Sequence, residues 1–381
     1  MVARKIFQKI VCVILISLLL SGCLSKPKSQ TGDFSGKVVD AYTQEPVPGV
    51  TMKIGEIQIT TDEDGKFCIA SLSPGDYQLV LERDWYNSSM EVVHHIEKQN
   101  SLKYFIIPLP IEGKILYSGN AADNWEIYEL DLSKRLVSQL TNMDSSEINP
   151  VKYSEDQILI QSTFLSHDRY NYDLFSFNRI SQEFKLIFSS TENDQHPSCK
   201  ISGDTVIFQS EGKKIYSYSF SSNTAKKIIE KGQNPVVSPS GTQIAYVDTN
   251  NHLCVANIDG TDIRTINHSG KVNNPCWSPT DRNKIAVELW EESGGPRYIY
   301  IMNADGTGTP QRVTWGSLKR DQHKHPCWSN DGSMIYFSGN ILYSSRYDIY
   351  GVRVSDGLQG KMSWVMVSGG SGDKKYPSWG L

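Results

Sequence analysis

The sequence predicts an all-β fold, a small β-sandwich followed by a six-bladed β-propeller that the C-terminal strand closes. Residues 33–109 contain short alternating runs of apolar and polar residues, separated by closely spaced turn motifs. Residues 110–381 repeat one unit, a proline-led strand followed by three more strands. The spacings are 47, 38, 40, 51 and 51 residues between the anchors Pro150, Pro197, Pro235, Pro275, Pro326 and Pro377. Four strands per unit at this period are typical of propeller blades.

Residues 1–22 have the pattern of a secretory signal peptide. Basic residues in the first nine positions precede an apolar run from Ile10 to Leu20. This run would rise about 16 Å as a helix, which is too short for a hydrocarbon core of about 30 Å. We therefore expect residues 1–22 to be removed rather than to remain as a membrane span.

The segment Leu20-Ser21-Gly22-Cys23 resembles the lipobox of prokaryotic lipoproteins. The resemblance implies cleavage after Gly22 and a lipid anchor on Cys23, whose acyl chains attach a protein stably without a spanning helix. Residues 23–32 are polar and form a tether. We expect an extracytoplasmic, membrane-anchored lipoprotein on the periplasmic or cell-surface side, depending on the host envelope. A plain secretory signal with an incidental cysteine is the alternative.

Charge and cysteine content narrow the functional classes. The chain of 381 residues has a net charge of −4, and loss of residues 1–22 leaves 35 basic and 42 acidic residues, a net charge of −7. A mildly acidic chain without a basic stripe predicts no nucleic-acid partner. No two cysteines have the C-x-x-C spacing of a zinc ribbon. We expect mostly buried, small apolar roles for Cys68, Cys199, Cys254, Cys276 and Cys327.

Four motifs in residues 33–109 occur in the order of the carboxypeptidase regulatory-like, or transthyretin-like, domain, which this segment resembles. They are Phe34–Asp40, Pro46–Val50, Thr61–Phe67 and Pro74–Tyr77. The resemblance implies a spacer or adhesion module without catalytic residues. The acidic loop Asp62–Gly65 also suggests calcium, but an EF-hand loop needs its glycine at the sixth position, and here it falls on the fourth. A hairpin turn is the preferred interpretation.

The two ends of the repeat array predict the number of blades. Residues 113–141 hold three strands without a proline-led strand before them, and Tyr376–Gly380 supplies a proline-led strand at the other end. These four strands complete a sixth blade and close the ring. The units resemble the WD-like repeats of the TolB β-propeller family, although Tyr153 and Lys200 stand where tryptophan is usual. TolB carries an N-terminal α/β domain, which the sandwich replaces here, so the resemblance implies the fold and not a Tol-system role.

The sequence contains no catalytic motif that we recognise. It lacks HExxH, Ser371 is not in a nucleophile elbow, and the glycine-rich segment 357–361 lacks the P-loop spacing. Prolyl oligopeptidases place a similar propeller before a hydrolase domain, and no such domain is seen here. We therefore predict no catalytic residue, no metal site and no cofactor.

Histidine and aspartate residues cluster where two blades begin. Asp194-Gln195-His196 in blade 3 and Asp321-Gln322-His323-Lys324-His325 in blade 6 precede the proline of the innermost strand. Such loops line one mouth of a propeller channel, so we expect the candidate ligand-binding residues Asp194, His196, Asp321, His323 and His325 to converge there. A metal or an acidic sugar would suit them, and oligogalacturonate lyases are propellers that use such histidines. The alternative is an ordinary turn of the repeat, formed elsewhere by Asn149, Asn234 and Asn274.

These patterns favour a non-enzymatic function. The leading hypothesis is a lipid-anchored, extracytoplasmic binding or scaffold protein whose propeller presents a face to a cell-envelope protein or glycan. The alternative is an enzyme of the lyase or hydrolase kind that acts on polysaccharide through a His/Asp site at the channel mouth. A structural spacer without a ligand is the third possibility.

Overall fold

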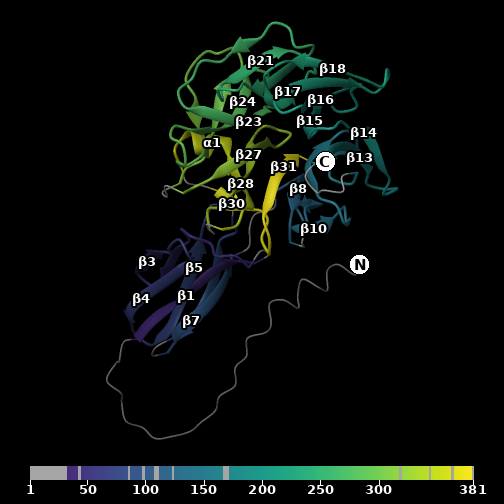
Figure 1. The fold of residues 1–381 in the computed structure, drawn as a ribbon. Helices are drawn as coiled ribbons and strands as arrows, with labels where there is room; N and C mark the ends of the chain where they lie inside the picture. Colours follow the sequence, from purple (N-terminus) through teal and green to yellow (C-terminus); the bar gives the residue numbers. More distant parts are fainter. Residues whose placement is uncertain are drawn as a thin grey trace, which may run out of the picture.

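The computed structural model describes residues 32–41, 44–84, 86–96, 99–106, 111–121, 124–165, 171–316, 320–342, 345–361 and 364–379. These residues form 31 strands and one helix of five residues, arranged as two adjoining domains (Figure 1). This part of the chain contains no helix that is long and apolar enough to cross a membrane. The predicted signal peptide, the Gly22–Cys23 lipidation site and the tether up to residue 31 lie outside the described residues.

The N-terminal domain consists of two sheets, with strand orders β4-β1-β7 and β3-β2-β5-β6. The first sheet contains β1 (Gly32–Asp40), β4 (Lys66–Leu72) and β7 (Gln99–Ile106). The second contains β2 (Thr51–Ile54), β3 (Ile57–Thr60), β5 (Gly75–Glu82) and β6 (Ser89–His95). Alternate residues of each sheet form its apolar core, in which Met52 and Leu79 are fully buried in one cluster with Phe34. The predicted sandwich is therefore present.

Six further sheets, each of four strands, form the propeller blades. The innermost strands of blades 1 to 6 are β31 (Lys374–Trp379), β11 (Glu147–Lys152), β15 (Gln195–Cys199), β19 (Gln233–Val237), β23 (Lys271–Trp277) and β27 (His323–Trp328). The second strands are β8 (Lys114–Gly119), β12 (Gln157–Ser162), β16 (Thr205–Ser210), β20 (Gln243–Val247), β24 (Lys284–Trp290) and β28 (Met334–Gly339).

The third and fourth strands of each blade lie farther from the channel. The third strands are β9 (Glu126–Asp131), β13 (Asp173–Asn178), β17 (Lys214–Ser219), β21 (Leu253–Asn257), β25 (Tyr298–Asn303) and β29 (Asp348–Arg353). The outer strands are β10 (Leu136–Gln139), β14 (Phe184–Phe188), β18 (Thr224–Ile229), β22 (Arg264–Thr265), β26 (Gln311–Arg312) and β30 (Trp364–Met366). The helix α1 (Val354–Leu358) connects β29 to β30.

The ring closes between the two ends of the propeller. Strand β31 pairs antiparallel with β8, so that Lys374 lies opposite Gly119 and Trp379 lies opposite Ile115. The predicted six blades and their closure by the C-terminal strand are confirmed. Closure leaves the propeller without an exposed sheet edge at its seam.

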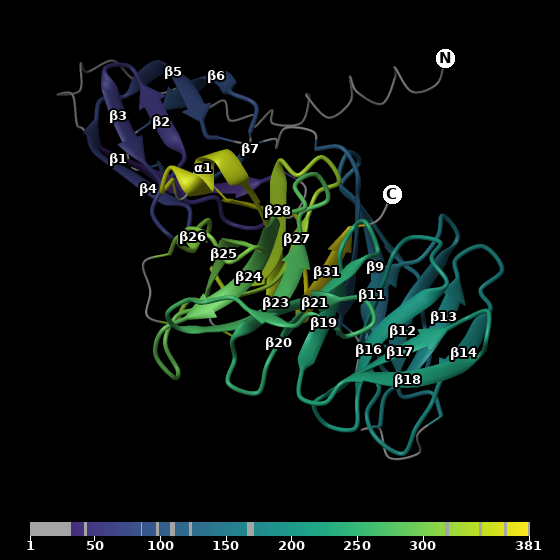
Figure 2. The same cartoon turned by 90° about the horizontal axis from the view of Figure 1, so that it is seen from above.

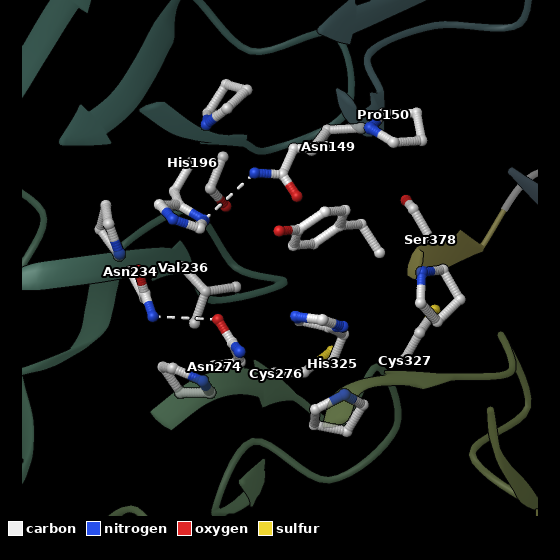
Figure 3. A pocket seen from close by; sticks show the side chains of 18 residues that line it. Asn149, Pro150, His196, Asn234, Val236, Asn274, Cys276, His325, Cys327 and Ser378 are labelled. Carbon is white, nitrogen blue, oxygen red and sulfur yellow. Dashed lines mark hydrogen bonds between the residues drawn. The ribbon is translucent and has the colours of Figure 1, made fainter. Parts of the chain in front are cut away.

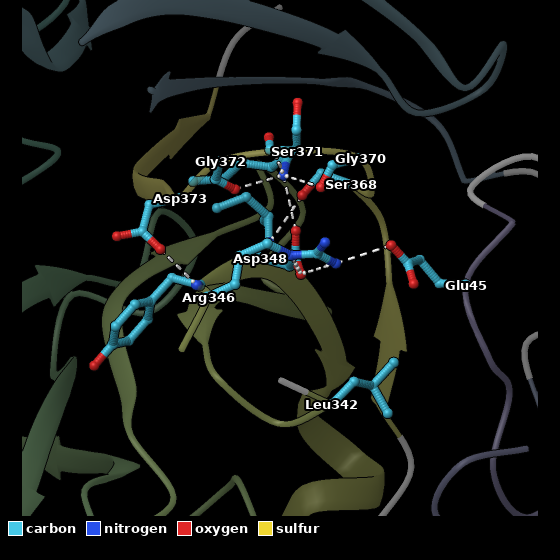
Figure 4. Close-up of polar contacts among 12 residues, drawn as sticks. Glu45, Leu342, Arg346, Asp348, Ser368, Gly370, Ser371, Gly372 and Asp373 are labelled. Atoms are coloured by element: carbon cyan, nitrogen blue, oxygen red, sulfur yellow. Dashed lines mark hydrogen bonds and ion pairs between the residues drawn. The ribbon is translucent and has the colours of Figure 1, made fainter. Parts of the chain in front are cut away.

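The sandwich packs against the propeller where blades 6 and 1 meet (Figures 1 and 2). One continuous apolar cluster contains Phe34 of the sandwich, Ile115 of blade 1 and Tyr336 of blade 6. Beside it, the Arg346 guanidinium donates a hydrogen bond to a carboxylate oxygen of Glu45 at 2.8 Å. Figure 4 shows this contact. The sandwich is therefore fixed to the seam of the ring rather than separated from it by a free linker.

Candidate functional site

Each innermost strand of the propeller carries the same irregularity at the residue before its proline. All six of these residues have positive φ, with values of 54°, 52°, 50°, 42°, 52° and 54° for Asn149, His196, Asn234, Asn274, His325 and Tyr376. The strand register also shifts at these positions, as in a β-bulge. Positive φ is uncommon for residues other than glycine. Six equivalent occurrences in one ring therefore make a repeated structural device, which we call the channel ring.

The channel ring surrounds a cavity of about 210 Å³. From each innermost strand, the cavity is lined by the ring residue, the proline after it and the following residue. Figure 3 shows the labelled side chains of His196, His325, Asn149, Asn234 and Asn274 around this space. The cavity has the size of one side chain or one sugar ring, so it suits a protruding part of a larger partner.

Side chains of the second strands support the strained backbone of the ring. Gln161 accepts a hydrogen bond from the backbone N–H of His196 at 2.8 Å, and Gln209 accepts one from Asn234 at 3.1 Å. In blade 5, Glu288 accepts one from the N–H of His325 at 2.8 Å. Each of these acceptors lies in the blade before the one that contains the ring residue. The hydrogen bonds replace those that the bulge removes from the strand ladder.

The side chains of the channel ring are uncharged at neutral pH. Burial lowers the pKa of His196 to about 4 and holds the pKa of His325 well below its ordinary value. The imidazole of His196 is 3.3 Å from Nδ2 of Asn149, and the ring of His325 packs on Tyr376 with centroids 4.2 Å apart. The ring thus presents amide, imidazole and phenol groups, which donate and accept hydrogen bonds without net charge.

The structure does not bring the five predicted ligand-binding residues together. His196 and His325 line the channel, whereas His323 is fully buried between the rings of Tyr298 and Phe337, at centroid distances of 5.2 and 5.0 Å. Burial lowers the pKa of His323 to about 3. The prediction of a five-residue cluster was therefore wrong for His323, because the bulge directs residues 323 and 325 to different sides of the strand.

The two predicted aspartates also lie away from the channel. Asp194 is fully buried, accepts a hydrogen bond from the Ser190 hydroxyl at 3.1 Å, and has its pKa raised to about 6 by burial. Asp321 is buried at the edge of a separate cavity of about 450 Å³, between the sandwich and blades 5 and 6. Neither residue contributes to the lining of the channel.

Most residues of the channel ring were not predicted as site residues from the sequence. Asn149, Asn234 and Asn274 were expected only as turn residues, and Tyr376 only as part of the closing strand. The repeated motif was visible, because each of these residues directly precedes an anchor proline. What the sequence did not reveal is that the backbone at this position directs the side chain into the channel. Within the described ranges, no three His, Cys, Asp or Glu side chains gather as metal ligands.

Comparisons with known proteins agree with the two domains. Residues 33–103 match the family model of the carboxypeptidase regulatory-like domain. The crystal structure of TolB from Acinetobacter baumannii is similar to this chain, with 14% sequence identity and a TM-score of 0.58. The alignment covers 80% of this chain and 79% of the TolB chain. Hydrazine synthase from Kuenenia stuttgartiensis is also similar, with 12% sequence identity and a TM-score of 0.57. This alignment covers 71% of this chain and 47% of the hydrazine synthase chain.

A third solved structure, an oligogalacturonate lyase in complex with manganese, aligns with 67% of this chain and 74% of its own at 14% identity and a TM-score of 0.47. No curated protein sequence matches the chain. The N-terminal domain is thus a carboxypeptidase regulatory-like domain, and the likeness to TolB establishes the fold of the propeller.

Proposed function

We propose that this protein is a lipid-anchored, extracytoplasmic binding protein, and that the channel ring receives an uncharged polar part of an envelope protein or glycan. The observation that carries the proposal is the ring itself. Six side chains from six blades are held by strained backbone around one cavity. Residues held in sparsely populated backbone conformations cluster at functional sites, which supports a functional role for the ring.

The chemistry of the ring favours binding over catalysis. Its two imidazoles are neutral, and in the described part of the chain neither imidazole is hydrogen-bonded to a carboxylate. A histidine that acts as a general base usually needs a pKa near the operating pH and a group that orients it. Amides and neutral imidazoles instead match the hydroxyl groups of a sugar or the amides of a peptide.

The position of the sandwich supports a role as a spacer between the predicted anchor and the propeller. Its first strand, β1, follows the predicted anchor at Cys23 after only eight residues, which span at most about 29 Å when fully extended. Because the sandwich is packed on the seam of the propeller, the anchor would also limit the distance of the propeller from the membrane.

An enzyme that acts on polysaccharide is the second candidate. Two histidines at the channel, His196 and His325, are the observation in its favour. It would require one of them to act with a group from the substrate, since Asp194, Asp321 and His323 are buried elsewhere.

The test is affinity capture from the native envelope with the anchored protein and with a soluble Cys23→Ala form. A His196→Ala/His325→Ala double variant of each form removes two ring side chains, and His252→Ala, which changes a half-exposed histidine outside the channel, is the matched control. We expect a partner that both forms enrich, that the control retains and that the double variant loses. Equal enrichment by the double variant would contradict the proposal, and turnover of a captured glycan would favour the enzyme.

A further inference from the structure

The innermost strands share a second repeated position, two residues before the channel ring. Here the backbone N–H donates a hydrogen bond to the preceding blade. Lys374 donates to the carbonyl of Tyr347 at 2.8 Å, Glu147 to Trp125 at 2.8 Å, and Asp194 to Tyr172 at 2.7 Å. The acceptor in each case directly precedes the first residue of the third strand, which is Asp348, Glu126 or Asp173. Three blade junctions therefore place a buried carboxylate opposite an ionisable residue in the same geometry.

At the junction between blades 6 and 1, a lysine balances the charge of the buried carboxylate of Asp348. The ammonium of Lys374 is 2.9 Å from Oδ1 of Asp348 and also donates to backbone carbonyls of residues 370–372 (Figure 4). Arg346 binds the other oxygen of Asp348 at 2.8 Å and reaches Glu45. Two positive groups thus balance two buried or half-buried carboxylates, as burial of charge requires.

The junction between blades 1 and 2 pairs two glutamates. Both oxygens of Glu126 accept hydrogen bonds, one from Asn124 and the other from the Thr141 hydroxyl. Oε1 of Glu147 accepts from two serine hydroxyls, and Oε2 has no hydrogen-bond partner among the residues that the structure describes. Burial, with the second carboxyl beside it, raises the pKa of Glu147 to about 7. A single proton on Glu147 removes the repulsion between the two carboxylates and leaves one negative charge, on Glu126, whose two oxygens both accept hydrogen bonds.

The junction between blades 2 and 3 leaves more oxygen atoms unsatisfied. Oδ1 of Asp173 and Oδ2 of Asp194 are buried and have no hydrogen-bond partner within the described structure, and the same holds for Oδ1 of Asn171. Asp173 and Asp194 are 2% and 0% exposed, respectively, and the charge of Asp173 acts on Asp194. No lysine or arginine forms an ion pair with either aspartate among the described residues. An unsatisfied buried polar oxygen is costly, so two carboxylate oxygens and one amide oxygen of this kind in one junction require an explanation. Ser190 links the residues, because its hydroxyl donates to Asp194 and its carbonyl accepts from Nδ2 of Asn171 at 3.4 Å.

We propose that this junction binds a calcium ion, held by Asp173 and Asp194 with the amide oxygen of Asn171. All three candidate ligands are oxygen atoms, which hard cations prefer, and calcium tolerates the irregular set of ligands that water completes. The charge of the ion balances the two aspartates, as Lys374 and Arg346 together balance Asp348 and Glu45. The site is separate from the channel and was not predicted from the sequence, where no metal site was expected.

The experiment is calorimetric titration of the full chain with calcium chloride after removal of bound metal with a chelator. We expect about one calcium ion per chain and a thermal unfolding temperature that rises with calcium concentration. Asp173→Asn and Asp194→Asn each remove one charged ligand and keep the side-chain shape, so calcium should bind at least about tenfold more weakly to either variant. Glu183→Gln, at an exposed acid on the turn before β14, is the control and should bind as the wild type does.

The aspartate variants lose a buried charge, so they should fold without calcium at least as well as the wild type. Two results would overturn the proposal. One is absence of calcium binding by the wild-type chain. The other is calcium binding that persists in an Asp173→Asn/Asp194→Asn double variant. If the wild-type chain does not bind calcium and its stability falls as the pH rises, the proposal is wrong. The junction then holds a proton shared by the two aspartates, as the junction between the two glutamates does.

Discussion

The innermost strands carry two sets of residues, the channel ring and the junction residues, and the side chains of the two sets point to different surroundings. The channel ring lies directly before the prolines, and the junction residues lie two positions earlier. In a regular strand, residues two apart point to the same face of the sheet. Here His325 faces the channel, whereas His323 packs between Tyr298 and Phe337. The positive φ at the ring residue and the bulge beside it separate the two sets.

One short motif therefore serves two purposes. The ring residues are neutral and line an open cavity, which suits recognition of a partner. Four of the six junction residues, Lys374, Glu147, Asp194 and His323, are ionisable and buried between blades, so any charge that they carry must be balanced within the protein. Changes in the first set should alter binding. Changes in the second should leave binding unchanged and should alter stability to the extent that they disturb the balance of buried charge.

The largest effect is expected at the seam of the ring. Lys374→Met removes the ammonium from Asp348 and leaves a buried carboxylate with Arg346 alone, which should lower the free energy of unfolding by about 3–5 kcal/mol. Urea denaturation measures the change. Lys361→Met removes a half-exposed ammonium near Asp356 and should cost less than about 1 kcal/mol. A Lys374→Met variant as stable as this control would show that the lysine does not hold the seam.

An intermediate effect is expected at the glutamate junction and should depend on pH. The pKa of Glu147 is raised from 4.5 to about 7, so the folded protein keeps a proton that the unfolded chain releases earlier. The stability from this proton is complete below pH 4.5 and is lost as the pH rises through 7, on the order of 3 kcal/mol in total.

Glu147→Gln should remove this loss. Urea midpoints at pH 5 and pH 8 should differ less for the variant than for the wild type. The same difference in both proteins would mean that Glu147 is not protonated in the folded state.

The smallest effect is expected at His323. Both ring nitrogens of this buried histidine lack a hydrogen-bond partner within the described structure. Replacement by leucine removes two unsatisfied polar atoms, so His323→Leu should leave stability unchanged or raise it by about 1 kcal/mol. Partner capture should also be unchanged, unlike in the variants of His196 and His325. Loss of capture in a stable His323→Leu variant would mean that the junction residues take part in binding.

The sequence was sufficient for the architecture because its cues are local and repeated. Six prolines at similar spacing predicted six blades, and the three strands before Pro150 predicted that Tyr376–Gly380 closes the ring. The candidate site depended on a backbone feature that the sequence does not display. Alternation would place His323 with His325 and Asp194 with His196, and only the left-handed residue before each proline separates them.

The proposed function requires that the channel ring contacts a partner directly. A photoreactive diazirine amino acid at Tyr376, in the ring, tests it in intact cells, and the same group at Tyr216, a half-buried residue on β17 outside the channel, is the control. We predict a cross-linked protein or glycan adduct with the group at Tyr376 and none at Tyr216. Adducts only at Tyr216, or none at Tyr376 when the protein is folded and anchored, would contradict the account.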